Sequence, residues 1–152
     1  MDNKDRKILA LLQDNAMLTA AEIAEQVGLT TTPCWRRIQR LEAQGYIRNR
    51  VALLDRNKMN VGITVFVSVR ANRHAGDWID RFRELVRRTP EIIEAHRLSG
   101  DTDYLLRVVV PSIESFDQVY KQMVNSLEFT DVSSSFSMEE LKYTTAIPVT
   151  YV

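Results

Sequence analysis

The chain has 152 residues, 45% apolar and 26% charged, and its 20 basic and 20 acidic residues cancel, which predicts a globular protein without an overall basic field. One cysteine excludes an intramolecular disulfide and a cysteine-rich zinc site, and the charged first residues are unlike a secretory signal, so a cytoplasmic location is expected. The longest uncharged apolar run, residues 59–69, is shorter than the roughly 18 residues that span a membrane, which excludes an integral membrane protein.

Charge is unevenly distributed along the chain. Residues 1–61 carry ten basic and seven acidic side chains, net +3, and residues 62–152 carry ten and thirteen, net −3. The apolar pattern changes at the same point, from helical periods to the strict alternation of Ile63–Val69. We therefore predict two domains, residues 1–54 and residues 62–152, joined by a linker over residues 55–61.

The first domain is predicted to contain three helices. The first begins near Asp2, whose carboxylate suits the positive end of a helix dipole. The second, about residues 20–27, begins with a capping box of Thr19 and Glu22 and stops at Gly28. A third helix begins directly after it. A short helix, a tight turn and a further helix make a helix-turn-helix.

The third helix is predicted to bury Trp35, Ile38 and Leu41 and to expose a basic surface. Residues 35–50 contain five arginines and one glutamate, and residues 46–51 alternate like the short strand of a wing. Because the start of such a helix reaches base edges in the major groove, we expect a DNA-binding surface here. The alternative is a solvated basic face on a plain three-helix bundle. The expected DNA-binding residues are Thr31, Thr32, Arg36, Arg37, Arg40, Arg48 and Arg50.

The second domain is predicted to be a ferredoxin-like βαββαβ unit, which makes the whole chain α+β. The expected elements are strand 62–71, helix 75–89, strand 91–99, strand 102–110, helix 112–127 and strand 132–142. Apolar residues at helical spacing indicate core rather than a cofactor site. The fold serves enzymes, electron carriers and sensors alike, so it does not decide function.

Catalytic chemistry is not apparent in the sequence, and we expect no enzyme, no metal and no cofactor. His74 and His96 have no partner at helical spacing that would complete a metal face. Cys34 would be a redox sensor if neighbouring arginines favoured its thiolate, but a small buried packing residue is the commoner role.

The richest polar cluster is the turn at residues 99–104. Its glycine permits close backbone approach, and its two carboxylates would accept hydrogen bonds from an ammonium group, which suits an amino acid zwitterion. A plain Gly-Asp hairpin turn explains the same residues. The serines at residues 133–137 read equally well as an exposed polar edge.

Several segments together resemble the Lrp/AsnC family, also called leucine-responsive or feast/famine regulators. They are Leu29–Ile38 (LTTTPCWRRI), Arg40–Ile47, Ala52–Asp55, Gly100–Arg107 (GDTDYLLR) and Met138–Lys142. The resemblance implies a transcription regulator whose winged helix-turn-helix binds double-stranded DNA at the nucleoid. It also implies a C-terminal domain that forms homodimers, often assembled to octamers, and senses a free amino acid.

The resemblance also places the effector between neighbouring dimers, near the 99–104 turn and the last strand. The carried-over residues are Ser99, Gly100, Asp101, Asp103, Tyr104, Ser135, Phe136 and Ser137. Leucine-responsive members tend to be aromatic or aliphatic where this chain has Ser135 to Ser137, so we expect a small or polar effector. Thr30–Trp35, Ser134–Met138 and Lys142–Thr145 most resemble the members linked to cysteine handling, which makes cysteine the first candidate. The competing hypothesis is a small ferredoxin-fold amino-acid sensor or enzyme without specific DNA binding.

Overall fold

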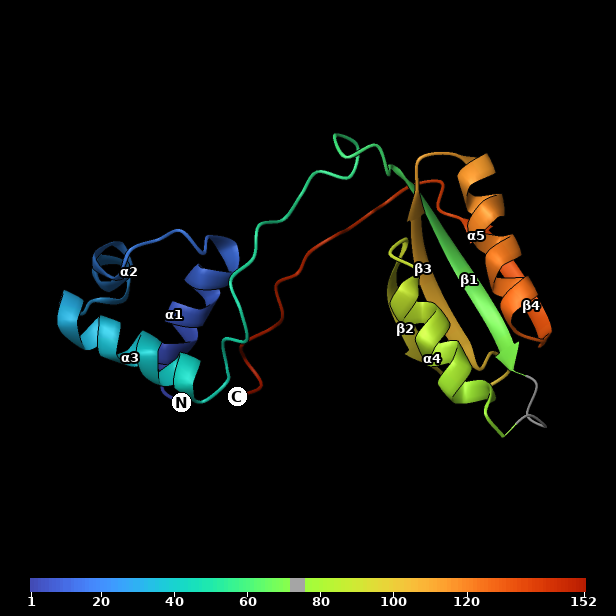
Figure 1. The fold of residues 1–152 in the computed structure, drawn as a ribbon. Helices are drawn as coiled ribbons and strands as arrows, with labels where there is room; N and C mark the ends of the chain where they lie inside the picture. The colour runs from blue at the N-terminus through green and yellow to red at the C-terminus, as the bar shows by residue number, and fades with distance from the viewer. Residues whose placement is uncertain (72–75) are drawn as a thin grey trace. The chain divides into compact units, whose positions relative to one another are not determined.

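The computed structural model describes residues 1–71 and 76–152, which divide into two compact units (Figure 1). The first unit contains Met1–Leu53 and Leu141–Val152, and the second contains Leu54–Glu140. The domain expected over residues 62–152 therefore differs at its C-terminal end, where residues 141–152 group with the first unit.

The first unit is built from three helices, α1 (Asn3–Asp14), α2 (Ala20–Val27) and α3 (Thr31–Ala43). Both α1 and α2 begin with a capping box, in which the N-cap side chain and the residue three positions later exchange hydrogen bonds. Gly28 ends α2 in the left-handed conformation, with φ of 66°. The buried core of this unit is Ile8, Leu9, Leu12, Ile23, Ala24, Val27, Cys34, Ile38 and Leu41.

Two expectations for this unit were wrong in detail. Trp35 does not face the core: it is 52% exposed, while Cys34 is completely buried. Cys34, Ile38 and Leu41 advance by four and three residues, which keeps them on one helix face, whereas repeated steps of three drift away from it. The segment 46–51 forms no strand, because the Tyr46 amide donates to the Leu41 carbonyl as the helix ends and no described segment pairs with residues 47–51.

The end of the chain packs on α1. The Gln13 side-chain amide donates to the Ile147 carbonyl at 3.0 Å and accepts from the Ile147 N–H at 2.8 Å. Arg6 Nε donates to the Val152 carbonyl at 2.6 Å, and Val149 packs against the core of the unit. These contacts explain why residues 141–152 belong to the first unit.

The second unit confirms the βαββαβ order. Its elements are β1 (Ile63–Ala71), α4 (Trp78–Arg88), β2 (Ile92–Arg97), β3 (Tyr104–Val110), α5 (Ile113–Ser126) and β4 (Phe129–Phe136). The four strands form an antiparallel sheet in the order β2-β3-β1-β4. The last strand starts and stops earlier than the predicted 132–142, because its pairing with β1 runs only from Ala71, opposite Phe129, to Val65, opposite Phe136.

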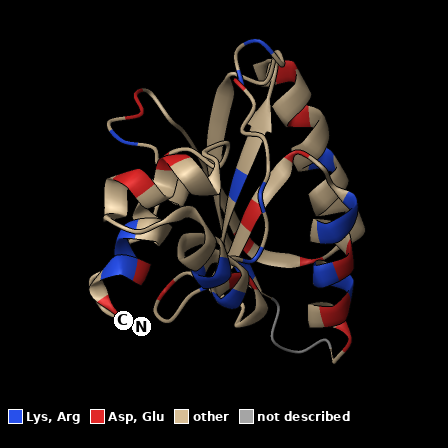
Figure 2. Ribbon diagram, turned by 90° about the vertical axis from the view of Figure 1, so that its left-hand side faces the viewer, with Lys and Arg blue, Asp and Glu red and all other residues tan. Residues whose placement is uncertain are grey.

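Both helices cover the same face of this sheet (Figure 1), where the inward residues of the central strands, Val65, Val67, Val69, Leu106, Val108 and Val110, are buried. Acidic and basic residues are interspersed along α4 (Figure 2), and Arg87 and Glu84 form an ion pair there. The opposite side of the sheet, hereafter the open face, carries Phe66, Ser68, Leu105, Arg107, Ser133 and Ser135. Alternation along each strand therefore separates a hydrophobic core from a mixed, half-exposed surface.

Candidate DNA-binding surface and effector site

The exposed side of α3 is fixed by its buried stripe. Cys34, Ile38 and Leu41 face the core, and at about 100° per residue Thr32, Arg36 and Gln39 lie on the opposite side. Those residues are exposed, as is Thr31 at the helix start. This side of α3 has the position and the polar chemistry that base recognition requires.

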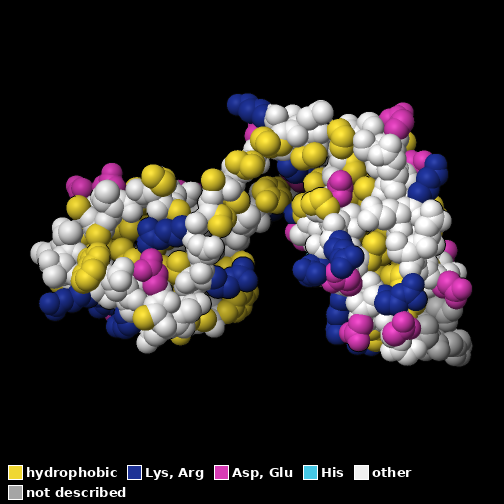
Figure 3. Space-filling view, viewed as in Figure 1, with side chains coloured by type: hydrophobic (Ala, Val, Ile, Leu, Met, Phe, Trp, Pro, Cys, Tyr) yellow, Lys and Arg dark blue, Asp and Glu magenta, His cyan; other side chains and the backbone are white. Residues whose placement is uncertain are grey.

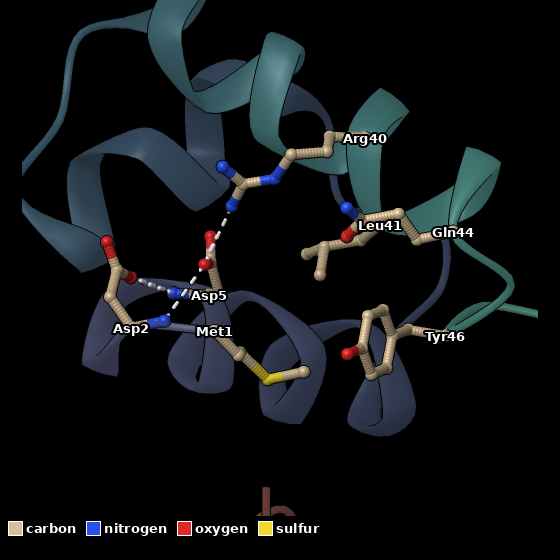
Figure 4. A pocket seen from close by; sticks show the side chains of 7 residues that line it. All are labelled: Met1, Asp2, Asp5, Arg40, Leu41, Gln44 and Tyr46. Atoms are coloured by element: carbon tan, nitrogen blue, oxygen red, sulfur yellow. Dashed lines mark hydrogen bonds and ion pairs between the residues drawn. The ribbon is translucent and has the colours of Figure 1, made fainter.

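Arg37 and Arg40 have different surroundings from Arg36, because both pair with the start of α1. Arg37 Nη1 lies 2.6 Å from Asp2 Oδ2 and 2.8 Å from Asp5 Oδ1, and Arg40 Nη2 lies 2.7 Å from Asp5 Oδ2. Figure 4 shows Arg40 reaching toward Asp5, and both residues line an open cavity of about 450 Å³. We call these four side chains the α1–α3 ion-pair cluster.

Asp5 is the centre of this cluster. Only 1% of it is exposed, and its carboxylate also accepts the backbone N–H of Asp2 at 3.1 Å. The backbone N–H of Asp5 and the Arg37 guanidinium lower the pKa of Asp2 from 3.8 to about 2, and the two carboxylates raise the pKa of Arg37. The ion pairs of these two aspartates with the guanidinium groups therefore hold α3 in its orientation against α1.

The two arginines beyond α3 also differ from each other. Arg50 Nη2 donates to Glu42 Oε1 at 2.8 Å, and Arg50 Nη1 donates to the Ala16 carbonyl at 3.3 Å. Arg48 is exposed. Basic and acidic side chains are likewise intermixed on the face shown in Figure 3. Part of the basic charge that was expected to contact DNA is thus neutralised by acidic side chains of the same chain.

Cys34 is completely buried beside this surface. Burial raises the pKa of the Cys34 thiol, and the nearby Arg37 guanidinium only partly opposes that shift. A thiolate, the form that reacts with oxidants, is therefore disfavoured near neutral pH. The position suits packing rather than redox sensing.

In the second unit, part of the predicted effector turn holds the sheet together. The Asp103 carboxylate accepts the Ala71 N–H at 2.9 Å, and the Asp103 N–H donates to the Val69 carbonyl at 3.0 Å. Tyr104 points into the core, with its ring centroid 4.7 Å from that of Phe82. Both residues have structural roles in this arrangement.

Three residues of the same turn remain accessible. Ser99, Gly100 and Asp101 are exposed, and Gly100 has a φ of 122°, a value that side-chain-bearing residues rarely adopt. Arg70 Nε donates to the backbone carbonyl of Asp101 at 2.6 Å, a hydrogen bond that does not use the Asp101 carboxylate. Asp101 is thus the acidic group at this turn most available to a ligand.

The predicted effector serines lie farther along the sheet. Ser135 pairs with Phe66, and Ser137, just after β4, donates its N–H to the Thr64 carbonyl, whereas Asp103 contacts Ala71. About five residues of β1 for Ser135 and seven for Ser137, or roughly 16 and 23 Å, therefore separate the serines from Asp103. Phe136 turns toward the helices, where its ring meets Phe116 at 5.4 Å. One chain therefore does not bring the predicted effector residues together.

The side chains that could bind a metal ion do not form a site in the part of the chain that the structure describes. No group of three or more His, Cys, Asp or Glu residues in that part could hold an ion. His96 is exposed beside Glu94 at 3.6 Å, and His74 lies outside the described residues. Across residues 1–71 and 76–152, no helix has the length and apolar character needed to cross a membrane.

A helix-turn-helix with an exposed polar recognition helix, joined to a ferredoxin-like unit, defines a DNA-binding regulator with an attached second domain. The comparisons identify the family. Residues 1–48 match a winged helix-turn-helix DNA-binding domain, and residues 64–147 match the Lrp/AsnC ligand binding domain. The chain belongs to the Lrp/AsnC family of transcriptional regulators.

Relatives of the same family match this chain along nearly its whole length. The glutamate uptake regulatory protein of Zymomonas mobilis is 52% identical and covers 98% of this chain and 91% of its own. An AsnC family transcriptional regulator from Agrobacterium tumefaciens has a crystal structure with a TM-score of 0.94 and 55% identity, over 99% of both chains. A transcriptional regulator from Neisseria meningitidis, solved as an L-Met complex, has a TM-score of 0.94 and 36% identity, over 99% of this chain and 98% of its own.

Proposed function

We propose that this regulator acts in the cytoplasm as a homodimer or larger assembly that reads double-stranded DNA through α3, with an affinity set by a bound amino acid. The observation that supports DNA binding through α3 is its exposed side, where Thr32 and Arg36 lie outside the α1–α3 ion-pair cluster. Arg36 is the main base-reading or phosphate-binding residue of this proposal. Thr31, at the start of α3, and Arg48, beyond its end, are exposed as well.

Arg36→Ala should lower DNA affinity without lowering thermal stability. A lost base contact costs about 1–3 kcal/mol, whereas a lost phosphate contact weakens all sequences alike and reduces the salt slope by about one. The measurement is a binding isotherm across a salt series on a duplex that the wild type selects from a random library. Arg83→Ala, an exposed arginine of α4 paired with Asp80, is the matched control. Unchanged binding in Arg36→Ala would remove α3 from the interface.

We place the subunit contact on the open face of the sheet. Phe66 is 39% exposed there and pairs across the strands with Arg107 and Ser135. An exposed aromatic side chain at the middle of a sheet face favours a covering partner. A two-fold dimer would also present two recognition helices to a pseudo-palindromic site. Dimers assembled to octamers remain the expectation from the family.

We place the effector where two subunits meet. The accessible turn at Ser99–Asp101 and the serines at Ser135 and Ser137 lie well apart along one sheet, so a second chain is needed to bring them together. The L-Met complex of the Neisseria relative supports an α-amino acid as the class of ligand. The hydroxyl groups of the serines favour a small or polar side chain, and cysteine remains our first candidate.

Asp101→Asn should weaken binding of the amino acid about tenfold or more, because the variant loses the charge that an ammonium group would meet. Calorimetric titration with cysteine, methionine, glutamate and leucine tests both site and selectivity. Asp131→Asn, an exposed carboxylate on β4, serves as the control. Equal binding by Asp101→Asn, or tighter binding of leucine than of cysteine, would contradict the proposed site or its selectivity.

A further inference from the structure

Trp35 is an aromatic side chain with no evident structural task. It is 52% exposed, and within the described part of the chain no other aromatic ring lies against it. The chain's other tryptophan, Trp78, is 3% exposed, stacks on Phe82 at 4.9 Å and donates to the Glu128 carbonyl. The two tryptophans therefore lie in different surroundings, one half-exposed and one in the core.

The position of Trp35 on α3 places it beside the residues proposed to read DNA. At about 100° per residue, the order around the exposed side of the helix is Trp35, Gln39, Thr32 and then Arg36. The flank with Arg37 and Arg40 comes next on the far side, where both are held by aspartates of α1. We call Thr32, Trp35, Arg36 and Gln39 the readout face; all four are exposed.

We propose that Trp35 contacts thymine methyl groups in the major groove and so helps to select the operator. This inference rests on the proposed docking of α3 in DNA. The thymine methyl is the only apolar group that a base presents in that groove, and apolar side chains recognise it by contact. An uncharged indole releases no counterions, so its contribution depends on sequence rather than on salt.

Arg36 and Trp35 would then divide the recognition. A guanidinium suits the acceptor atoms of guanine or a phosphate, and an indole suits a methyl group about one base step away. Gln39, whose Nε2 donates to Glu42 Oε2 at 3.0 Å, already has a partner on its own helix. The readout face thus combines one charged and one apolar group that can act independently.

The test compares wild type, Trp35→Ala, Trp35→Phe and Arg36→Ala on a duplex that the full-length wild type selects from a random library. Copies of that duplex carry uracil in place of one thymine at a time, which removes a single methyl. Wild type should lose about fourfold in affinity at one or two positions, the value expected for burying one methyl. Trp35→Ala should lose that sensitivity and keep the wild-type salt slope, and Trp35→Phe should retain part of it.

Fluorescence supplies a second readout. Addition of the selected duplex should change the emission of Trp35 and leave that of Trp78 unaltered, so the change should vanish in Trp35→Phe. Melting temperature should be the same in the Trp35 variants and wild type, because the side chain is exposed.

The outcomes separate this inference from the proposed function. If every uracil copy affects wild type and Trp35→Ala equally while Arg36→Ala binds weakly, the thymine contact is overturned and docking through α3 stands. If wild type selects no sequence at all, the DNA-binding function itself is contradicted.

Discussion

Asp5→Ala is expected to destabilise the first unit by about 2–4 kcal/mol. The Asp5 carboxylate is buried and pairs with Arg37 and Arg40, so its removal takes away the acidic partner of Arg40 and leaves Arg37 paired with Asp2 alone. The cost stays below that of breaking a fully buried pair, because half of the Arg40 side chain is exposed and can reach water. Chemical denaturation, monitored by the circular dichroism of the helices, measures this loss. The first unit should unfold in a separate transition at a lower denaturant concentration.

Asp14→Ala provides the control for that measurement. Asp14 lies at the other end of α1 and is exposed, and its charge sits at the unfavourable end of the helix dipole. The control should therefore unfold like wild type or slightly later. If Asp5→Ala and Asp14→Ala unfold alike, the α1–α3 ion-pair cluster contributes nothing to the first unit.

Local signals made the helices and the order of helices and strands along the chain predictable. Thr19 and Glu22 form a capping box with three-residue spacing, and Gly28 adopts the left-handed conformation that ends α2. The alternation from Ile63 to Val69 likewise appears in β1, where Val65, Val67 and Val69 are buried and Phe66 between them is exposed. Such features depend on neighbours within a few residues, so the sequence contains them directly.

Contacts between distant segments could not be predicted in the same way. Arg37 and Arg40 appeared free on α3 because their partners, Asp2 and Asp5, lie more than 30 residues earlier in the chain. Their three-residue spacing places both guanidinium groups on one flank of the helix, and that is the one signal of a shared acidic partner. Trp35 was misplaced for a related reason, since a small buried Cys34 satisfies the apolar stripe equally well.

The effector residues show the same limit on a larger scale. Sequence adjacency grouped Asp101 with Asp103, yet the Asp103 carboxylate holds the Ala71 amide and Asp101 is exposed. Adjacency also joined Phe136 to the serines beside it, although a strand sends alternate side chains to opposite faces. The pairing of β1 with β4 decides which residues share a surface, and only the fold supplies that pairing.

Phe66→Glu is expected to separate the proposed dimer. The substitution places a carboxylate at the centre of the open face, and the two-fold axis of a dimer would bring in a second one. Burying two carboxylates that face each other across the axis costs several kcal/mol, so the dimer dissociation constant should rise by about a thousandfold or more. Sedimentation velocity over a concentration series measures this change, with folding of the variant checked by circular dichroism.

Ile113→Glu gives the matched comparison on the helical side of the sheet. Ile113 is 63% exposed in the first turn of α5, where a carboxylate suits the helix dipole. This variant should sediment like wild type, because the proposed contact lies on the other side of the sheet. If Ile113→Glu dissociates and Phe66→Glu does not, the subunit contact lies over the helices, and the proposed position of the effector would have to move with it.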